Sequence, residues 1–194
     1  MYKYDKNNLI QQIHFMETYI SLLRGINVTG KNKLPMVELK GIYESLKCKN
    51  VVTYIQSGNV VFQHSNAGDI AKKIQQQILK QYGYTVPVFV RTIPEIKKIL
   101  KANPFLKEKD ILIDRLFVTF MDGKPAKENL EKLNGLSFDP DRFTISGSET
   151  YLYCPISYGN SKLSNNFFEN KLKVIATTRN WRTLNELVKI AEGI

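Results

Sequence analysis

The sequence predicts an α+β protein made of two tandem ferredoxin-like halves, in which helices pack on antiparallel or mixed sheets. Three observations predict this fold. Short apolar runs rich in β-branched residues alternate with longer segments that carry apolar residues at helical spacing. The order of these segments is strand, helix, strand, strand, helix, strand, which is the order of the split β-α-β unit. The same order then occurs a second time, and one more helix follows each copy.

Local signals mark the elements of the first half. Ser57-Gly58 is typical of a tight hairpin, Gly83 is typical of a helix end, and Thr92-Ile-Pro-Glu95 has the pattern of a capping box. The predicted elements of this half are strand 19–23, helix 36–48, strands 51–56 and 59–63, helix 67–82, strand 85–91 and helix 92–101.

The second half has weaker signals but the same order. Its last helix is the clearest, since Leu184, Leu187, Val188 and Ala191 lie on one helical face. The predicted elements are strand 116–121, helix 126–133, strands 142–146 and 150–154, helix 161–172, strand 173–176 and helix 181–191. The chain is accordingly divided into an N-terminal extension at 1–17, a first half at 18–103 and a second half at 104–194.

The composition narrows the class of protein. The 194 residues are 43% hydrophobic and 24% charged, which is typical of a globular chain. No apolar run approaches the roughly 20 residues that span a bilayer, and residues 1–15 lack the apolar core of a signal peptide. We therefore expect a cytoplasmic protein with no membrane partner. Cys48 and Cys154 lack metal-site spacing and only His14 and His64 are available, so we expect neither a metal nor another cofactor.

Positive charge is concentrated in the first half. The net charge is +10, and residues 19–103 hold 13 Lys and Arg against 4 Asp and Glu, whereas residues 104–194 hold 13 against 12. A basic surface favours a polyanionic partner, either nucleic acid or a phosphorylated small molecule. The alternative, which is equally open at this point, is that the lysines only keep the protein soluble.

The predicted topology gathers polar side chains into two clusters. In a split β-α-β unit the loop after the first strand lies beside the hairpin between the second and third strands. The loop after the third strand lies beside the end of the fourth strand. The candidate anion- or nucleic-acid-binding residues are Arg24, Asn27, Lys31, Lys33 and Asn59 in the first cluster, and Ser161, Lys162, Thr178, Arg179, Asn180 and Arg182 in the second.

The second cluster lies where an apolar strand stops and a helix begins, and residues 177–180 are expected to form the loop between them. A helix start presents free backbone N–H groups and the positive end of the helix dipole, which suits an anion. The same polar groups could instead cap the helix, and Trp181 is more often a packing anchor than a stacking surface.

The first cluster contains a partial phosphate-binding pattern. Gly25-Ile-Asn-Val-Thr-Gly-Lys31 follows a strand and fits G-x-x-x-x-G-K. Asn32 stands where a Mg²⁺-binding Ser or Thr belongs, and the following Lys-Leu-Pro delays the helix, so a nucleoside triphosphatase is not expected. A looser phosphate contact remains open. Structural alternatives are that Arg24 is buried against a carboxylate and that the two asparagines of this cluster satisfy turn geometry.

Several stretches of the sequence match a known family. They are Tyr19–Val28 with Lys31–Met36, Thr53–Phe62, and Ser161–Asn165 with Ala176–Thr183. With these stretches the sequence resembles the bacterial domain-of-unknown-function 1697 family. The resemblance implies an α+β protein with two ferredoxin-like halves, and it supplies no activity, cofactor or catalytic residue. Residues 1–15 lie outside it, and Thr29 replaces a glycine of the family's Asn-Val-Gly-Gly-Lys loop, which reduces backbone freedom.

The function best supported by the sequence is a non-catalytic binding module for nucleic acid or another phosphate-bearing anion, through basic loops. The alternative is an enzyme that acts on a small anionic, phosphorylated metabolite in a cleft between the halves. Arg24, Lys31, Lys162 and Arg179 would then hold charge, although no general base is evident. A purely structural, dimer-forming role is a third possibility.

Overall fold

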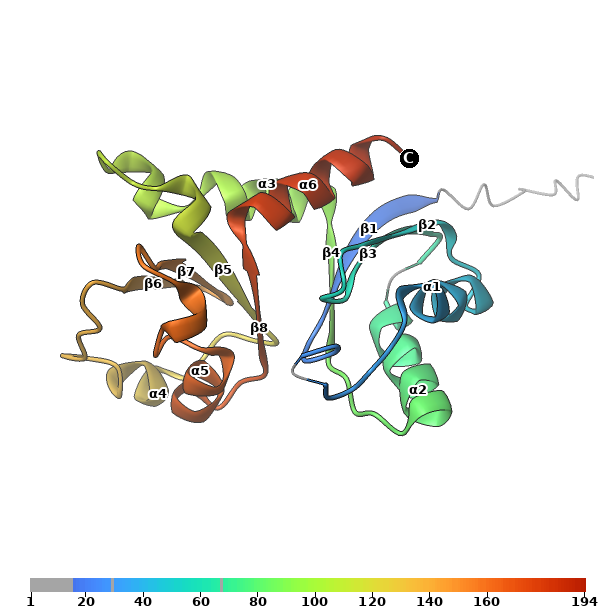
Figure 1. Ribbon diagram of the computed structural model, residues 1–194, viewed down its shortest axis with the longest axis horizontal. Helices are drawn as coiled ribbons and strands as arrows, with labels where there is room; N and C mark the ends of the chain where they lie inside the picture. Colours follow the sequence, from blue (N-terminus) through green and yellow to red (C-terminus); the bar gives the residue numbers. More distant parts are fainter. Residues whose placement is uncertain (1–15, 29, 67) are drawn as a thin grey trace, which may run out of the picture.

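The computed structural model describes residues 16–28, 30–66 and 68–194 (Figure 1). Most of the predicted N-terminal extension therefore lies outside the described residues, as do Thr29 and Ala67. Among the helices in the described ranges, none combines the length and the apolar character needed to cross a membrane. The described elements form an α+β fold, which confirms the predicted class.

Two four-stranded sheets form the centre of the protein, and all neighbouring strands in them are antiparallel. In each sheet, the strand that comes first in the chain pairs with the third and fourth strands. The first sheet consists of β1 (Glu17–Leu23), β2 (Lys49–Tyr54), β3 (Asn59–His64) and β4 (Val88–Thr92), in the order β2-β3-β1-β4. The second consists of β5 (Leu116–Met121), β6 (Arg142–Ser146), β7 (Glu149–Tyr153) and β8 (Ala176–Asn180), in the order β6-β7-β5-β8.

Capping residues and a left-handed glycine determine where several of the helices begin and end. Thr92 and Glu95 form the predicted capping box of α3, and Gly83 ends α2 in the left-handed region with φ 71°. Ser164 accepts a hydrogen bond from the N–H of Phe167 and starts α5 later than predicted. The helices of the described residues are α1 (Met36–Ser45), α2 (Ile70–Tyr82), α3 (Ile93–Lys101), α4 (Lys127–Glu131), α5 (Asn165–Leu172) and α6 (Trp181–Glu192).

Three hydrophobic clusters hold these layers together. Helices α1 and α2 cover one face of the first sheet, where Phe62 and Tyr43 are buried, and α4 and α5 cover one face of the second, around Phe168. The third cluster is shared, since α3 and α6 (Figure 1) cover the opposite faces of both sheets, and it contains Leu184 of α6, Ile20 of β1 and other residues of both sheets. The two sheets are therefore joined by a common core.

The last strand corrects one prediction. Residues 177–180 were expected to be a loop, but β8 runs through them and pairs with β5, placing Arg179 opposite Val118. The predicted strand at 173–176 was also misplaced, because β8 begins only at Ala176, where the apolar run ends, and polar residues form the rest of it. Two of these, Thr177 and Arg179, are buried nonetheless, because Arg179 donates to the distant backbone oxygen of Leu23 and Thr177 Oγ1 accepts a hydrogen bond from Arg179.

Candidate functional site

Arg179 of β8 joins the second sheet to residues at the edge of the first. Its side chain is 8% exposed, and each guanidinium nitrogen donates a hydrogen bond. Nη2 donates to the backbone oxygens of Leu23 at 2.7 Å and Ser57 at 2.9 Å, Nη1 donates to Thr177 Oγ1 at 2.9 Å, and Nε donates to Asn59 Oδ1. Burial lowers the pKa of Arg179 to about 10, so the group stays charged at neutral pH. Its donors are thus directed into the protein.

The asparagines of the first cluster support the backbone around this contact. Asn27 Nδ2 donates to the oxygens of Leu34 at 2.9 Å and Gln56 at 3.0 Å, and its Oδ1 accepts from the N–H of Leu34. Asn59 Nδ2 donates to the oxygen of Tyr54 at 3.1 Å. These bonds agree with the structural alternative that the two asparagine side chains stabilise turns.

Arg24 also joins the first sheet to the second, because it follows β1 and contacts α5. Its Nε and Nη2 donate to the carboxylate of Glu169, each at 3.1 Å, and Nη2 donates to Asn166 Oδ1 at 2.8 Å. The same carboxylate accepts from the N–H of Ala176 at 3.0 Å. The carboxylate partner of the structural alternative is therefore confirmed, but Arg24 is only partly buried, with 24% of its side chain exposed.

Thr178 faces away from Arg179 and towards α5. Its hydroxyl is 2.7 Å from Thr119 Oγ1 and 2.7 Å from Asn165 Oδ1. The ring of Tyr158 stacks nearby on Phe117, with ring centroids 4.6 Å apart, and burial raises the pKa of the Tyr158 hydroxyl. The side chains of Thr178, Thr119 and Tyr158 therefore lie together under α5, where they link the loop after β7 to β5 and β8.

The remaining predicted residues lie in separate places. Lys31 lines a pocket of about 580 Å³ between the halves, beside Arg24, whereas Lys33 is exposed outside it. Ser161 Oγ accepts from the N–H of Leu163 at 3.0 Å, and Lys162 lines another pocket, near Asp139 and Asp141. The two predicted clusters meet at the Arg179 contact but do not form one shared cleft.

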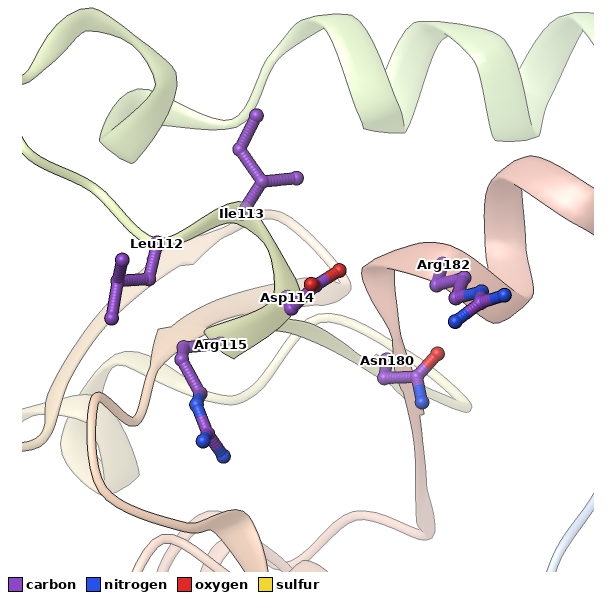
Figure 2. A pocket seen from close by; sticks show the side chains of 6 residues that line it. All are labelled: Leu112, Ile113, Asp114, Arg115, Asn180 and Arg182. Atoms are coloured by element: carbon purple, nitrogen blue, oxygen red, sulfur yellow. The ribbon is translucent and has the colours of Figure 1, made fainter.

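A further pocket lies at the start of α6 and has a volume of about 560 Å³ (Figure 2). Asn180 and Arg182, which line it, are predicted site residues. The short 3₁₀ turn Ile113–Arg115 and the residue before it supply the other side, which the sequence reasoning missed. A signal was available, because this turn directly precedes β5, whose Phe117 pairs with Asn180. The pocket is lined by Leu112, Ile113, Asp114, Arg115, Asn180 and Arg182.

The charged groups of this pocket are unpaired within the part of the chain that the structure describes. Among the described residues, neither guanidinium of Arg115 and Arg182 nor the carboxylate of Asp114 makes an ion pair or a side-chain hydrogen bond. Asn180 Oδ1 accepts from the N–H of Thr183 at 2.7 Å, which leaves other N–H groups of the first turn of α6 without an intrahelical acceptor. The pocket therefore combines two free cations, one free carboxylate and a helix start. Within the described ranges, no group of three or more acidic, His or Cys side chains could hold a metal.

The Asn180 cap gives a first testable prediction. Asn180→Ala should lower the free energy of unfolding by about 1 kcal/mol, because the N–H of Thr183 loses its acceptor. Asn180→Asp keeps an acceptor oxygen and should be nearly neutral in effect. Urea denaturation followed by circular dichroism measures both. Equal loss in the two variants would contradict a capping role.

Comparison with known proteins identifies the family of this chain. The model described as "Protein of unknown function (DUF1697)" matches residues 16–151, well over half of the chain. The fold is similar to the structure of the conserved bacterial protein SP0830 from Streptococcus pneumoniae, with a TM-score of 0.70 and 21% sequence identity, over 91% of this chain and 99% of that chain. No curated protein matches. The resemblance noted in the sequence is thereby confirmed, and the chain belongs to the DUF1697 family of proteins of unknown function.

Proposed function

We propose that this protein is a binding module for a small phosphate-bearing ligand, held in the pocket at the start of α6. The observation that carries the proposal is that Arg115 and Arg182 line one pocket and have no partner among the described residues. Guanidinium groups match the geometry of phosphate oxygens, and a helix start adds positive potential. With Asp114 included, the side chains of the pocket carry a net positive charge.

The other basic residues are less suited to bind an anion. Arg179 and Arg24 donate to protein groups, so an incoming anion would have to displace internal hydrogen bonds at either one. The carboxylate of Glu169, the acid in the pocket between the halves, is held by Arg24 and by the N–H of Ala176. A free general base is therefore not evident there, and no observation favours the enzyme alternative.

A concave pocket also suits a small ligand better than a long polyanion. Its volume of about 560 Å³ lies within the range of roughly 300–1,000 Å³ found for small-molecule sites. Contact with nucleic acid requires a continuous track of cations. Here Lys31 and Lys162 line two other pockets, so they do not continue the pair formed by Arg115 and Arg182.

Arg182→Ala tests the proposal directly. Isothermal titration with inorganic pyrophosphate should give binding that weakens with added salt, and the substitution should reduce affinity about tenfold, because a charge-assisted contact is lost. Lys72→Ala is the matched control, since this exposed residue of α2 carries the same charge away from the pocket. Equal affinities of the two variants would exclude this site. A single-stranded oligonucleotide that binds far more tightly than pyrophosphate would favour nucleic acid instead.

We also propose that each half is a ferredoxin-like unit, with the division at residues 103 and 104. The order of strands and helices supports this, as does the same strand order in both sheets, with the first strand between the third and the fourth. The helices α3 and α6 then act as additions to the two units that join them through the shared core.

A further inference from the structure

Strand β4 has a free edge that faces the second half of the protein (Figure 1). It is the last strand of the first sheet and pairs only with β1. The N–H of Arg24 donates to the oxygen of Pro87 at 2.9 Å, so in the alternating pattern of an antiparallel pair the backbone groups of Val88 and Val90 point away from β1. The Arg91 side chain donates to the oxygen of Val90 at 2.9 Å. Within the described residues, both of these valine N–H groups and the oxygen of Val88 have no hydrogen-bond partner.

Three adjoining pockets follow this edge. The central one, of about 450 Å³, is lined by residues 87–91, by α2 on one side and by Asp122 and Ile175 of the second half on the other. It shares Ile175 with the pocket of about 580 Å³ between the halves, and Arg91 with a pocket of about 490 Å³ between α3 and the β6–β7 hairpin. These pockets form the β4 groove. Because α2 and the second half flank the edge, a single extended chain fits there more readily than the edge of another sheet.

The unpaired charges of the β4 groove are cations. Lys31, Arg91 and Lys98 line it and, among the residues that the structure describes, take part in no ion pair. Residues 19–103, which supply most of the lining, hold 13 Lys and Arg against 4 Asp and Glu. The groove therefore favours an acidic chain. The carboxylates that line it already accept hydrogen bonds from protein donors, and they are Glu95, Asp122, Glu149 and Glu169.

We propose that the β4 groove binds an acidic segment of a partner protein in an extended conformation, which adds a strand to the first sheet. The backbone of this segment pairs with the N–H groups of Val88 and Val90 and with the oxygen of Val88. One of its carboxylates accepts from Nε and Nη2 of Arg91, which have no acceptor within the described ranges. The edge of β4 supplies affinity for any extended chain, and the cations select an acidic one. This interaction is separate from the pocket at the start of α6.

A synthetic peptide tests the pairing with β4. The probe has about eight residues, the length of an ordinary strand, alternates Glu and Val, and carries a fluorescent label. Two further forms carry N-methyl groups on alternate amides, one on all Glu residues and the other on all Val residues. Alternate N–H groups of a strand point to opposite sides, so only one set faces β4. We expect one methylated form to lose at least about tenfold in affinity for the full chain and the other to bind like the parent.

The charge of the groove is tested with protein variants and a second peptide. Fluorescence anisotropy should show that Arg91→Ala weakens binding of the Glu–Val peptide about tenfold, because a charge-assisted contact is lost. A peptide with Lys in place of Glu should bind at least about tenfold more weakly than the parent. Arg182→Ala is the matched control, since Arg182 does not line the β4 groove, and it should leave peptide binding unchanged.

Three outcomes would overturn this inference. If the two methylated peptides bind equally, the peptide does not pair with the edge of β4. If the Glu–Val peptide does not bind at about 1 mM, the groove is not a site for an acidic strand. If a single-stranded oligonucleotide displaces the peptide and binds more tightly through Arg91, the groove is assigned to nucleic acid instead. Pyrophosphate binding that depends on Arg182 is decided by its own titration, so the proposed function stands or fails separately.

Discussion

Arg179→Ala is expected to lower the free energy of unfolding by about 3–5 kcal/mol, because it removes a buried cation on which both halves depend. The substitution leaves the backbone oxygens of Leu23 and Ser57 and the side chain of Asn59 without their donor. It also opens a cavity between β8 and the β2–β3 hairpin. Arg179→Lys should recover little, since one ammonium group cannot reach acceptors that lie around a planar guanidinium.

The matched control is Arg182→Ala, three positions along the same strand–helix junction and exposed. We expect it to change stability by less than about 0.5 kcal/mol, since within the described ranges it breaks no ion pair or side-chain hydrogen bond. Urea unfolding monitored by tryptophan fluorescence and by circular dichroism measures both variants. Because the two sheets share a core, the two probes should give one coincident transition in the wild type. A loss below about 1 kcal/mol in Arg179→Ala would show that the contact between the halves does not depend on this residue.

Gly58→Ala is expected to have the second large effect, a loss of roughly 2–5 kcal/mol. Gly58 has φ +75°, and a Cβ there would lie 2.7 Å from the Cβ of Leu23 and 2.8 Å from Cδ1 of Ile26, both of which are buried. The added methyl group must therefore push the β2–β3 hairpin away from the end of β1. The N–H of Leu23 donates to the oxygen of Gly58 at 2.8 Å, and Arg179 donates to the neighbouring Ser57, so the contact between the halves moves as well.

Gly83→Ala separates backbone strain from crowding. Gly83 has φ +71°, nearly the same as Gly58, but nothing lies within 4 Å of the Cβ position. Its substitution should cost only the roughly 1–2 kcal/mol of a left-handed alanine. Thermal unfolding of the two variants gives the comparison. Equal destabilisation would mean that the close approach of Leu23 and Ile26 to Gly58 is relieved without cost.

The sequence by itself determined the α+β class, the order of elements and several of their ends. These are local properties, because a helical pattern, a left-handed glycine at Gly83 or a capping box at Thr92 and Glu95 involves residues that are close in the chain. The carboxylate alternative for Arg24 and the turn roles of Asn27 and Asn59 were also within reach, since these residue types commonly act in that way.

Only the tertiary structure decided what the polar residues of β8 do and which charged residues line one pocket at the start of α6. The strand β8 continues through Arg179 because this side chain donates to Leu23, Ser57 and Asn59, more than a hundred positions away in the sequence. No local sequence pattern specifies such distant partners. The same holds for the pocket at the start of α6. Its two sides, around Arg115 and Arg182, are joined by the pairing of β5 with β8. Among residues 16–28, 30–66 and 68–194, no segment supplies an ion-pair partner for these two side chains.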